Sequence, residues 1–273
     1  MDVDLDYPGG VHLETWAKCN AACVFCPYST LARKGVKMSD ALIEKVLTDL
    51  EDIPQPFYFT PSKVNEPFLD KRMLPLLEHI NTRLPNAILT LFSNGTPITG
   101  DKIDRISRLS NVEHLWISLN DHRPAEYEAV MKMPLARTLK RLDLLHIARF
   151  PHRVVVSRVC DNTPADDEFK AWVENRYPRF DVVLMKREAW IQDHKHAAIA
   201  TEVPVSKCSR WYEIDITSTG RVALCCMDGS ARYSYGDVSK QHVLEVFNSP
   251  AYKRMRAGSL TRQHYSPCNH CTY

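Results

Sequence analysis

Short apolar runs alternate with longer amphipathic stretches over most of the chain. The runs predict six strands: Val11 to Trp16, Phe57 to Thr60, Ala87 to Ser93, Val112 to Leu119, Arg153 to Cys160 and Asp181 to Lys186. The stretches between them have apolar residues at helical spacing and predict helices over 40–50, 73–82, 101–109, 135–150 and 166–177. Strands joined by helices pair in parallel through right-handed crossovers. Because six units cannot close an eight-stranded barrel, we expect an α/β fold, a partial (β/α)6 TIM-like barrel with its active face at the carboxyl ends of the strands.

The pattern changes after about residue 190, where the chain becomes polar and irregular. The change predicts a barrel, a linker and a small C-terminal module, over 1–190, 191–206 and 207–273. In the module, the runs 211–217 and 221–226 flank Ser218-Thr219-Gly220 and predict a hairpin, which is followed by one helix, Val243 to Arg256. A module of about 70 residues buries little apolar surface, so we expect it to need an added cross-link such as a bound metal.

Composition narrows the possible partners. The 273 residues are 44% hydrophobic and carry a formal net charge of +2, with both signs interspersed. This excludes disorder and gives no basic field for nucleic acid or an anionic membrane. The N-terminus lacks a basic region followed by an apolar one, and no apolar run reaches the roughly 18 residues that span a bilayer. We expect a soluble, cytoplasmic protein.

The nine cysteines carry the chemistry. Their number is odd and their density is far below the roughly 8 to 10% of disulfide scaffolds, which favours reduced thiols as metal ligands. Cys19, Cys23 and Cys26 lie in one loop just past the first predicted strand. Such a loop can hold three corners of an iron–sulfur cube, and one iron without a protein ligand is then open to a small chelating cofactor.

This CxxxCxxC loop, with Phe25 before its third cysteine, resembles the signature of the radical S-adenosylmethionine (SAM) superfamily. The resemblance implies that Cys19, Cys23 and Cys26 hold a [4Fe-4S] cluster whose free iron binds SAM, and that Phe25 packs near the adenine. One electron from the cluster then cleaves SAM, and a 5′-deoxyadenosyl radical abstracts a substrate hydrogen. The resemblance also implies a flavodoxin- or ferredoxin-type electron donor. A zinc knuckle is the alternative interpretation of the three thiols.

Further positions fall where this superfamily has its SAM contacts. Glu66-Pro67 matches the end of the family's GGEP stretch, although Val64 and Asn65 replace the glycines and lack their conformational freedom. Asn94-Gly95 resembles the TNG segment. The resemblance also implies SAM contacts at the ends of the fourth and fifth strands, from Ser118, Asn120, Ser157 and Arg158. Ordinary strand-end hydrogen bonding is the alternative for each of these polar residues.

A second cysteine set follows in the module. Cys208, Gly220 and Cys225 have the spacing that opens the SPASM pattern, the auxiliary-cluster extension of radical SAM enzymes, and a terminal CxxC follows at Cys268 and Cys271. The set resembles the shortened twitch version, which implies one auxiliary [4Fe-4S] cluster held by these four cysteines. Cys226 competes with Cys225 for one place, and the spacing from Gly220 favours Cys225. A structural zinc ribbon is the alternative.

Two clusters suggest an oxidation, because a fully ligated auxiliary cluster can still take the electron of a substrate radical. In size and cysteine plan the chain resembles the 2-deoxy-scyllo-inosamine dehydrogenases, which oxidise a secondary alcohol of an aminocyclitol. We therefore expect an oxidoreductase that acts on a small polar metabolite in natural-product biosynthesis. The hydroxyl proton needs a base, and Arg158, Lys186 and Arg187 are the candidates near the strand ends.

Three alternatives stay open. Cys160 or Cys226 at a strand end could return a hydrogen atom to the substrate, which would make the enzyme an epimerase. Many SPASM enzymes modify peptides, although only 18 residues precede Cys19 here. A zinc-binding interaction scaffold without catalysis is the third alternative, and the altered stretch before Glu66 is its best support.

Overall fold

A computed structural model describes residues 6–188, 190–191, 202–257 and 259–273. Within these residues the strands form one nine-stranded sheet in the order β6-β5-β4-β3-β2-β1-β7-β8-β9. The strands are β1 Gly10–Leu13, β2 Phe57–Thr60, β3 Ala87–Ser93, β4 Val112–Ser118, β5 Arg153–Val159, β6 Asp181–Met185, β7 Glu213–Ile216, β8 Arg221–Ala223 and β9 Gly236–Asp237.

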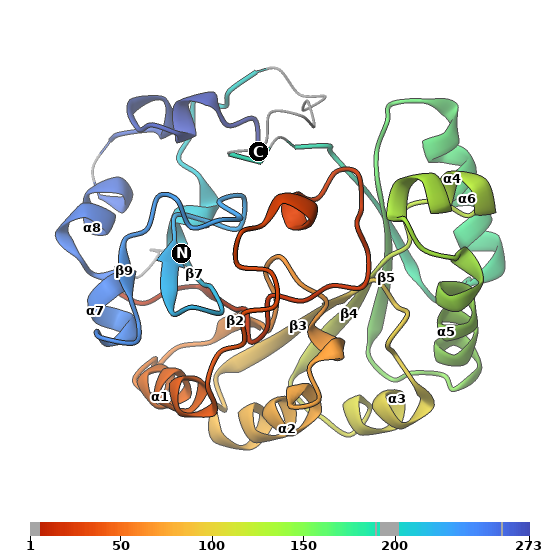
Figure 1. Cartoon of the computed structure of the whole chain (residues 1–273), viewed down its shortest axis with the longest axis horizontal. Helices are drawn as coiled ribbons and strands as arrows, with labels where there is room; N and C mark the ends of the chain where they lie inside the picture. Colours follow the sequence, from red (N-terminus) through yellow and green to blue (C-terminus); the bar gives the residue numbers. More distant parts are fainter. Residues whose placement is uncertain (1–5, 189, 192–201, 258) are drawn as a thin grey trace.

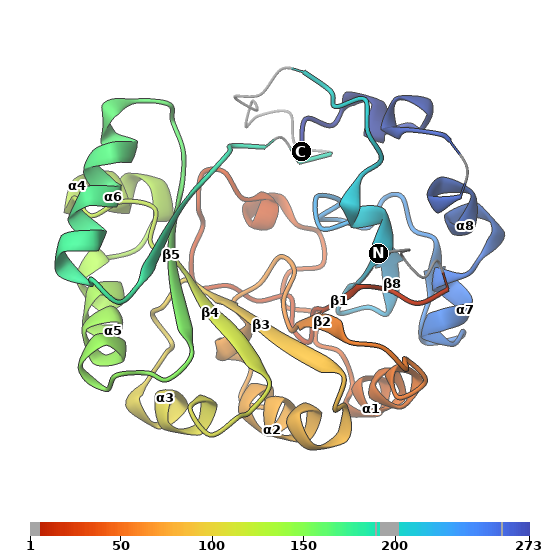
Figure 2. The same cartoon turned by 180° about the vertical axis from the view of Figure 1, so that it is seen from behind.

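Strands β1 to β6 pair in parallel, each with the next in sequence. Within the described residues β6 and β1 do not pair, so the sheet curves without closing (Figures 1 and 2). The predicted partial (β/α)6 barrel is confirmed, and so are all six predicted strands. The first strand is shorter than predicted, because it ends at Leu13 and the chain then leaves the sheet in a long loop.

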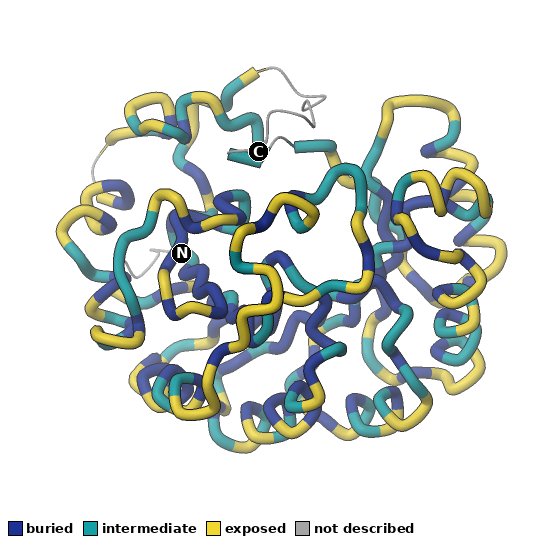
Figure 3. The backbone as a smooth tube through the Cα atoms, viewed as in Figure 1, coloured by how far each residue is buried: buried dark blue, intermediate teal, exposed yellow. Residues whose placement is uncertain are grey.

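The helices lie outside the curved sheet, with their exposed sides turned to solvent (Figures 1 and 3). They are α1 Asp40–Leu50, α2 Met73–Arg83, α3 Gly100–Ile106, α4 Pro124–Met131, α5 Leu135–Ile147, α6 Pro164–Arg176, α7 Val243–Phe247 and α8 Pro250–Arg256. Helix α1 illustrates the sequence logic: the Ser39 side chain caps it by accepting from the Leu42 N–H, and Val46 and Leu47 at helical spacing are buried.

Two helix predictions need correction. Helix α4 was not expected, although Pro124 at its first position is a recognised start signal. The single helix predicted over Val243 to Arg256 is wrong, because the chain forms α7 and α8 with a break at Asn248 and Ser249, just before Pro250. Proline has no N–H to donate and disfavours helical geometry in the residue before it, and Ser249 accordingly has ψ 145°.

The C-terminal module extends the barrel sheet. Strand β7 pairs in parallel with β1, and the predicted hairpin is confirmed as β7 and β8 with Gly220 in a left-handed turn conformation at φ +86°. Apolar residues of α7 and α8 belong to the same buried cluster as those of the barrel. Most of the predicted linker, 192–201, lies outside the described residues. In the part of the chain that the structure describes, no helix has the length and apolarity to cross a membrane.

Candidate functional site

The first cysteine loop, defined here as residues 14–38, begins where β1 ends and runs to the start of α1. It crosses the space between the two ends of the curved sheet (Figures 1 and 2). Cys19, Cys23 and Cys26 are each partly exposed. Burial raises the pKa of the Cys23 thiol, and negative charge on Cys26 and Cys19 raises it further. This charge effect indicates that the three thiols lie close together. The structure therefore brings the three predicted ligands to one place.

The surroundings of these thiols fit metal ligation. Burial raises the pKa of Cys19 to about 12 and that of Cys26 to about 11, so without a metal both are protonated at neutral pH. The backbone N–H of Ala21 lies 3.4 Å from the Cys19 sulfur, a donor of the kind that stabilises thiolate ligands. Three converging thiols with such donors suit an iron–sulfur cluster, whose positive charge would favour the thiolate form.

The Glu66 loop, defined as residues 61–67, lies beside the first cysteine loop. The Glu66 carboxylate is buried and accepts from the Ser93 hydroxyl at 3.0 Å and from the Asn94 N–H at 2.7 Å. Burial raises the pKa of Glu66 to about 7, against the effect of these hydrogen bonds. The Asn94 side-chain amide donates to Oδ1 of the Asn20 side chain at 2.8 Å, and its nitrogen is 4.0 Å from the Cys19 sulfur. Glu66 and Asn94 are thus joined to the cysteine loop.

The residues that replace the family's glycines impose no backbone strain. Among the described residues with positive φ, neither Val64 nor Asn65 occurs. The Val64 side chain is buried at 2% exposure and packs with Ala17 and Leu31 of the first cysteine loop. The substitution therefore adds an apolar contact between the two loops, and it does not argue against a working site.

Polar residues at the ends of β4 and β5 reach the same region. Asn120, just past β4 at φ +65°, accepts from the Val159 N–H at 2.9 Å, and its amide nitrogen lies 3.1 Å from the Met131 sulfur. That sulfur is also 3.5 Å from the Cys23 sulfur. Ser118 ends β4 and pairs across the sheet with Ser157. The Ser157 hydroxyl already has one hydrogen-bond partner, because it accepts from the Trp116 indole N–H at 2.7 Å.

Arg158 is the centre of a buried ion network. Its guanidinium, 4% exposed, donates to Asp121 at 2.8 Å, to Asp161 at 3.0 Å and to Asp166 at 2.7 Å. Burial alone would lower the pKa of Arg158, but Asp166 and Asp121 raise it above its ordinary value. These contacts support a positioning role for Arg158 more than a role as proton acceptor.

The other predicted catalytic residues lie at the ends of β5 and β6, the side of the sheet farthest from the module in strand order. Cys160 follows β5 and is partly exposed; burial, followed by the charge of Asp166, raises the pKa of its thiol. Lys186 follows β6 and is exposed. Arg187 forms an ion pair with Asp161. The structure therefore joins Arg187 to the Arg158 network through one shared carboxylate.

The second cysteine set is assembled from distant parts of the module. All nine cysteines of the chain are free, and Cys208, Cys225 and Cys268 are buried. Cys208 and Cys271 both lie close enough to Cys268 for their charges to raise the pKa of its thiol, which burial raises first, to about 11. Burial raises the pKa of the Tyr235 phenol to about 12, with contributions from Cys268 and then Cys225. Tyr235 therefore lies close to both Cys225 and Cys268.

Cys225 and Cys226 are the two candidates for one ligand place. Cys226 is partly exposed, and the groups that shift its pKa, after burial, begin with Asp215 and Arg210. Burial comes first for Cys225 too, and its pKa is raised well above the usual range. The charge of Asp215 raises the pKa of both thiols and that of Lys63 opposes the rise in both, so these charges do not separate the two cysteines. The choice of Cys225 as the ligand stays a prediction.

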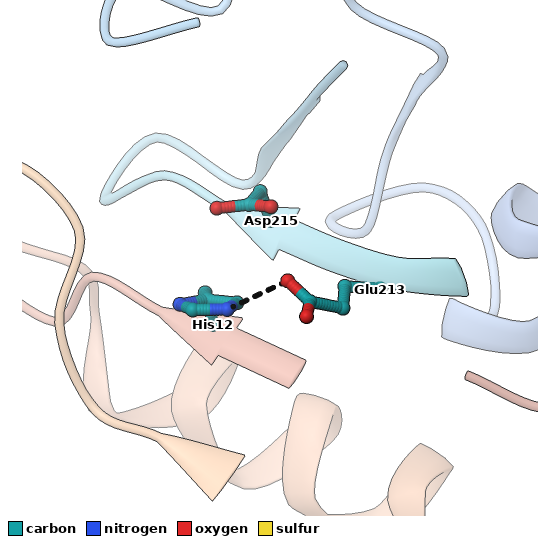
Figure 4. Close-up of side chains that lie close together, drawn as sticks. All are labelled: His12, Glu213 and Asp215. Carbon is teal, nitrogen blue, oxygen red and sulfur yellow. Dashed lines mark hydrogen bonds and ion pairs between the residues drawn. The ribbon is translucent and has the colours of Figure 1, made fainter. Parts of the chain in front are cut away.

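Sequence reasoning missed a charged group at the seam between β1 and β7. His12, Glu213 and Asp215 place ligand atoms within 4.8 Å of one another, and His12 Nε2 lies 3.2 Å from Glu213 Oε2 (Figure 4). Glu213 also pairs with Arg210 at 2.7 Å, and Asp215 pairs with the buried Lys63 at 3.2 Å. Because each carboxylate already has a cationic partner, we interpret the group as a charge-balanced network. Its only sequence signal is the alternation of Glu213 and Asp215 on one strand face.

A second missed feature is the ion pair of Glu14 and Arg33. Glu14 directly follows β1 and is fully buried, and the Arg33 Nε and Nη2 atoms lie 2.7 and 2.9 Å from its two oxygens. A carboxylate at the end of an apolar strand was the available signal, because a buried charge requires a partner.

Comparisons with known proteins agree with this geometry. The family model of the radical SAM superfamily matches residues 13–174, and that of an iron–sulfur cluster-binding domain, SPASM, matches residues 208–272. No curated protein matches the chain in sequence.

Several solved structures share the fold. The structure of BtrN in complex with AdoMet and 2-DOIA is 16% identical, with a TM-score of 0.64 over 97% of this chain and 93% of that one. A structure of anSMEcpe with bound AdoMet is 12% identical, with a TM-score of 0.67 over 91% and 79%. SuiB from Streptococcus suis bound to the precursor peptide SuiA is 14% identical, with a TM-score of 0.67 over 98% and 70%.

The matched radical SAM domain contains the first cysteine loop, the Glu66 loop and Asn94, and it implies SAM and a [4Fe-4S] cluster. The matched C-terminal domain contains the second cysteine set and implies auxiliary iron–sulfur binding. With more than half of its length inside the first match, the chain belongs to the radical SAM superfamily and carries a SPASM domain.

Proposed function

We propose that this radical SAM enzyme oxidises a secondary alcohol of a small polar metabolite, such as a sugar or an aminocyclitol. In this proposal Cys19, Cys23 and Cys26 hold the cluster that binds SAM. Cys208, Cys225, Cys268 and Cys271 would hold an auxiliary [4Fe-4S] cluster, which would supply an acceptor for the electron of the substrate radical. A flavodoxin- or ferredoxin-type protein supplies the electron that is used to cleave SAM.

The main support for the proposal is a pair of contacts made by the Glu66 loop. Lys63 of the Glu66 loop donates from its ammonium to the Cys225 carbonyl at 2.8 Å, while Glu66 of the same loop bonds Asn94 beside Cys19. A single short loop is therefore bonded directly to Cys225 of the second cysteine set and linked through Asn94 to Cys19 of the first. A substrate radical formed next to this loop would lie near an electron acceptor, which is the arrangement that an oxidation requires and that an isomerisation does not.

The remaining roles, which are SAM binding and proton transfer, fall to residues of the chain itself. When bound, the first cluster and SAM supply a 5′-deoxyadenosyl radical for hydrogen abstraction. The Glu66 loop and Asn94 would bind the amino group of SAM, and Phe25 would pack near the adenine. Ser118, Asn120, Ser157 and Arg158 would orient its ribose and carboxylate. The ion pairs of Arg158 and Arg187 favour positioning roles for both, which leaves Lys186 as the proton acceptor to test first.

The test is product analysis on anaerobically reconstituted protein. Two cubane clusters give about eight iron atoms per chain and a brown colour, whereas a zinc scaffold is colourless. We then expect dithionite-reduced protein to form 5′-deoxyadenosine and a ketone in equal amounts from a panel of aminocyclitols and sugars. Formation of 5′-deoxyadenosine with no oxidised product from any panel member would contradict the proposal.

The same experiment separates the other candidate activities. Inversion of a carbinol centre that is lost in Cys160→Ala or Cys226→Ala would identify an epimerase. Turnover only with a peptide would identify a peptide-modifying enzyme, a class for which the likeness to SuiB bound to its precursor peptide is the support. Neither outcome yields a ketone from a small metabolite, so each is distinct from the expected result.

A further inference from the structure

We propose that the C-terminal module positions the Glu66 loop through Glu14 and Lys63, so that the affinity of the first site for SAM depends on metal binding in the module. The inference rests on the SAM-binding role proposed above for the Glu66 loop. It does not depend on which substrate is oxidised.

Glu14 joins three parts of the molecule through one carboxylate. Besides its two bonds from Arg33, Oε1 accepts from the Val64 N–H at 3.2 Å, and Oε2 accepts from the Ser218 N–H at 3.1 Å. Burial alone would raise the pKa of Glu14, but Arg33 and these two N–H groups hold it below the ordinary value. Glu14 is therefore a buried anion whose bonds join the first cysteine loop, the Glu66 loop and the turn after β7.

Arg33 extends this junction to a second point of the module. Its third donor, Nη1, bonds the Gly229 carbonyl in the segment between β8 and β9. A Cβ atom at Gly229 would lie 3.1 Å from Pro27 and 3.5 Å from Val64. This close approach means that the module backbone packs directly on the first cysteine loop and the Glu66 loop, without space for a side chain.

Lys63 forms the second junction. Its side chain is fully buried, and its ammonium lies 3.2 Å from Asp215 Oδ1, 2.8 Å from the Cys225 carbonyl and 3.5 Å from the Cys226 carbonyl. A buried ammonium is stable only when it is paired and hydrogen-bonded, so the position of Lys63 is tied to these acceptors. One acceptor belongs to a proposed auxiliary-cluster ligand, and a metal that orders Cys225 would therefore order Lys63.

The attachments divide the loop into two halves. Lys63 and Val64 are bonded to the module and to Glu14, whereas Glu66, two residues later, is bonded to Ser93 and Asn94 of the barrel. A displacement of the module would pull on residues 63–64 while Glu66 stays in place. The backbone between them, which resembles the family's SAM-binding stretch, would take up the difference.

The experiment measures the dissociation constant of SAM on reconstituted holoprotein. We expect the double variant Cys268→Ala/Cys271→Ala to keep the first cluster but to bind SAM at least about fivefold more weakly, the low end of ordinary coupling between sites. In a Lys63→Met/Asp215→Asn background, the same cysteine changes should weaken SAM binding less than they do in the parent, because the Lys63 junction is gone and only the Glu14 junction remains. Additive effects, or an unchanged SAM affinity in Cys268→Ala/Cys271→Ala, would overturn the inference.

Hydrogen exchange gives a second readout that does not depend on catalysis. In Cys268→Ala/Cys271→Ala, the amides of residues 61–67 should exchange faster than in the parent, while those of β2 should not change. Unchanged exchange in 61–67 would also overturn the inference, even if the Lys63 variants fail to fold.

The matched control is Asp70→Asn. Asp70 is a buried carboxylate paired with Arg72 at 2.7 Å, and its further described partners, Lys37 and Thr15, also lie outside the C-terminal module. We expect this change to lower stability without altering how the cysteine changes affect SAM binding. If the SAM coupling holds but no ketone forms, only the proposed oxidation fails; if a ketone forms without coupling, only this inference fails.

Discussion

The first cysteine loop is supported by the barrel, whereas the C-terminal cysteines are supported by little regular structure. The loop follows a buried strand, and Glu14, Arg33 and the packed side chain of Val64 hold it against its neighbours. The segment 257–273, which carries Cys268 and Cys271, contains only two helical turns within its described residues, Arg262–His264 and Cys268–His270.

Hydrogen bonds from one arginine hold this C-terminal segment, together with the packing of Tyr265 on Trp211. Arg262 is buried and bonds the Ser206 carbonyl at 3.2 Å, the Lys207 carbonyl at 3.4 Å and the Tyr273 carbonyl. Three-residue helices and one guanidinium contribute far less than a buried helix face. From this difference we expect the barrel to present its thiols before metal binds, and the C-terminal thiols to depend more on the metal for their placement.

The largest expected effects come from removing each metal separately. Cys19→Ala should abolish 5′-deoxyadenosine formation and lower iron from about eight to about four atoms per chain. Its thermal unfolding should stay close to that of the parent, because the contacts of Glu14 and Val64 remain. Iron analysis, product analysis and calorimetry measure the three quantities.

Cys268→Ala should remove a similar amount of iron but change the structure as well. Limited proteolysis should now cut within residues 257–273, while the barrel resists cleavage. Equal protease resistance in Cys19→Ala and Cys268→Ala would show that the two cysteine regions do not differ in their dependence on metal.

The sequence predicted the barrel better than the module for a physical reason. Each barrel strand is a buried apolar run and each helix has a long apolar face, so local pattern and final structure agree. Helix α7 has five residues and β9 has two, lengths at which a pattern cannot be recognised. The parallel pairing of β7 with β1 joins residues about 200 positions apart and leaves no local trace.

The candidate site divides in the same way. Cys19, Cys23 and Cys26 lie within eight residues, so their spacing alone predicts the shared site. The contacts of Glu14 with Ser218 and of Lys63 with Asp215 were not predicted, because Ser218 and Asp215 belong to the module and approach only after folding. Arg158 was predicted to contact SAM, a prediction that stays untested, but the carboxylates that surround it were not foreseen.

A stability test can sharpen the contrast from the barrel side. Arg158→Met leaves Asp166 buried without its cation and leaves Asp121 with Arg123 as its remaining cationic partner, which should destabilise the protein by about 3–5 kcal/mol in chemical denaturation. The control is Arg153→Met, which breaks an ion pair of Arg153 and Asp181 that is more than half exposed for Arg153 and should cost less than about 1 kcal/mol. Similar losses for the two variants would mean that the Arg158 network is not a major support of the barrel.

The pH dependence of stability should report on the same network. Arg123 and Arg158 hold the pKa of Asp121 at about 2, below its ordinary 3.8, although burial opposes them. A carboxylate with a lowered pKa in the folded state stabilises that state above its unfolded pKa, and this contribution disappears as the pH falls from about 4 to about 2. The amount is about 2 kcal/mol. Asp121→Asn should flatten the stability profile in this window, and an unchanged slope would contradict the assignment.

The smallest expected effect concerns the choice between neighbouring thiols. Cys225 and Cys226 are adjacent and both lie near Asp215 and Lys63, but Cys226 also lies near Arg210, whereas Tyr235 lies close to both Cys225 and Cys268. Cys226→Ala should therefore keep about eight iron atoms per chain and change stability by less than about 1 kcal/mol, whereas Cys225→Ala should lose about half of the iron. The reverse pattern would make Cys226 the ligand. It would also place the metal on the thiol that lies near Arg210, and Arg210 would then join the charges that couple the C-terminal cysteines to the barrel.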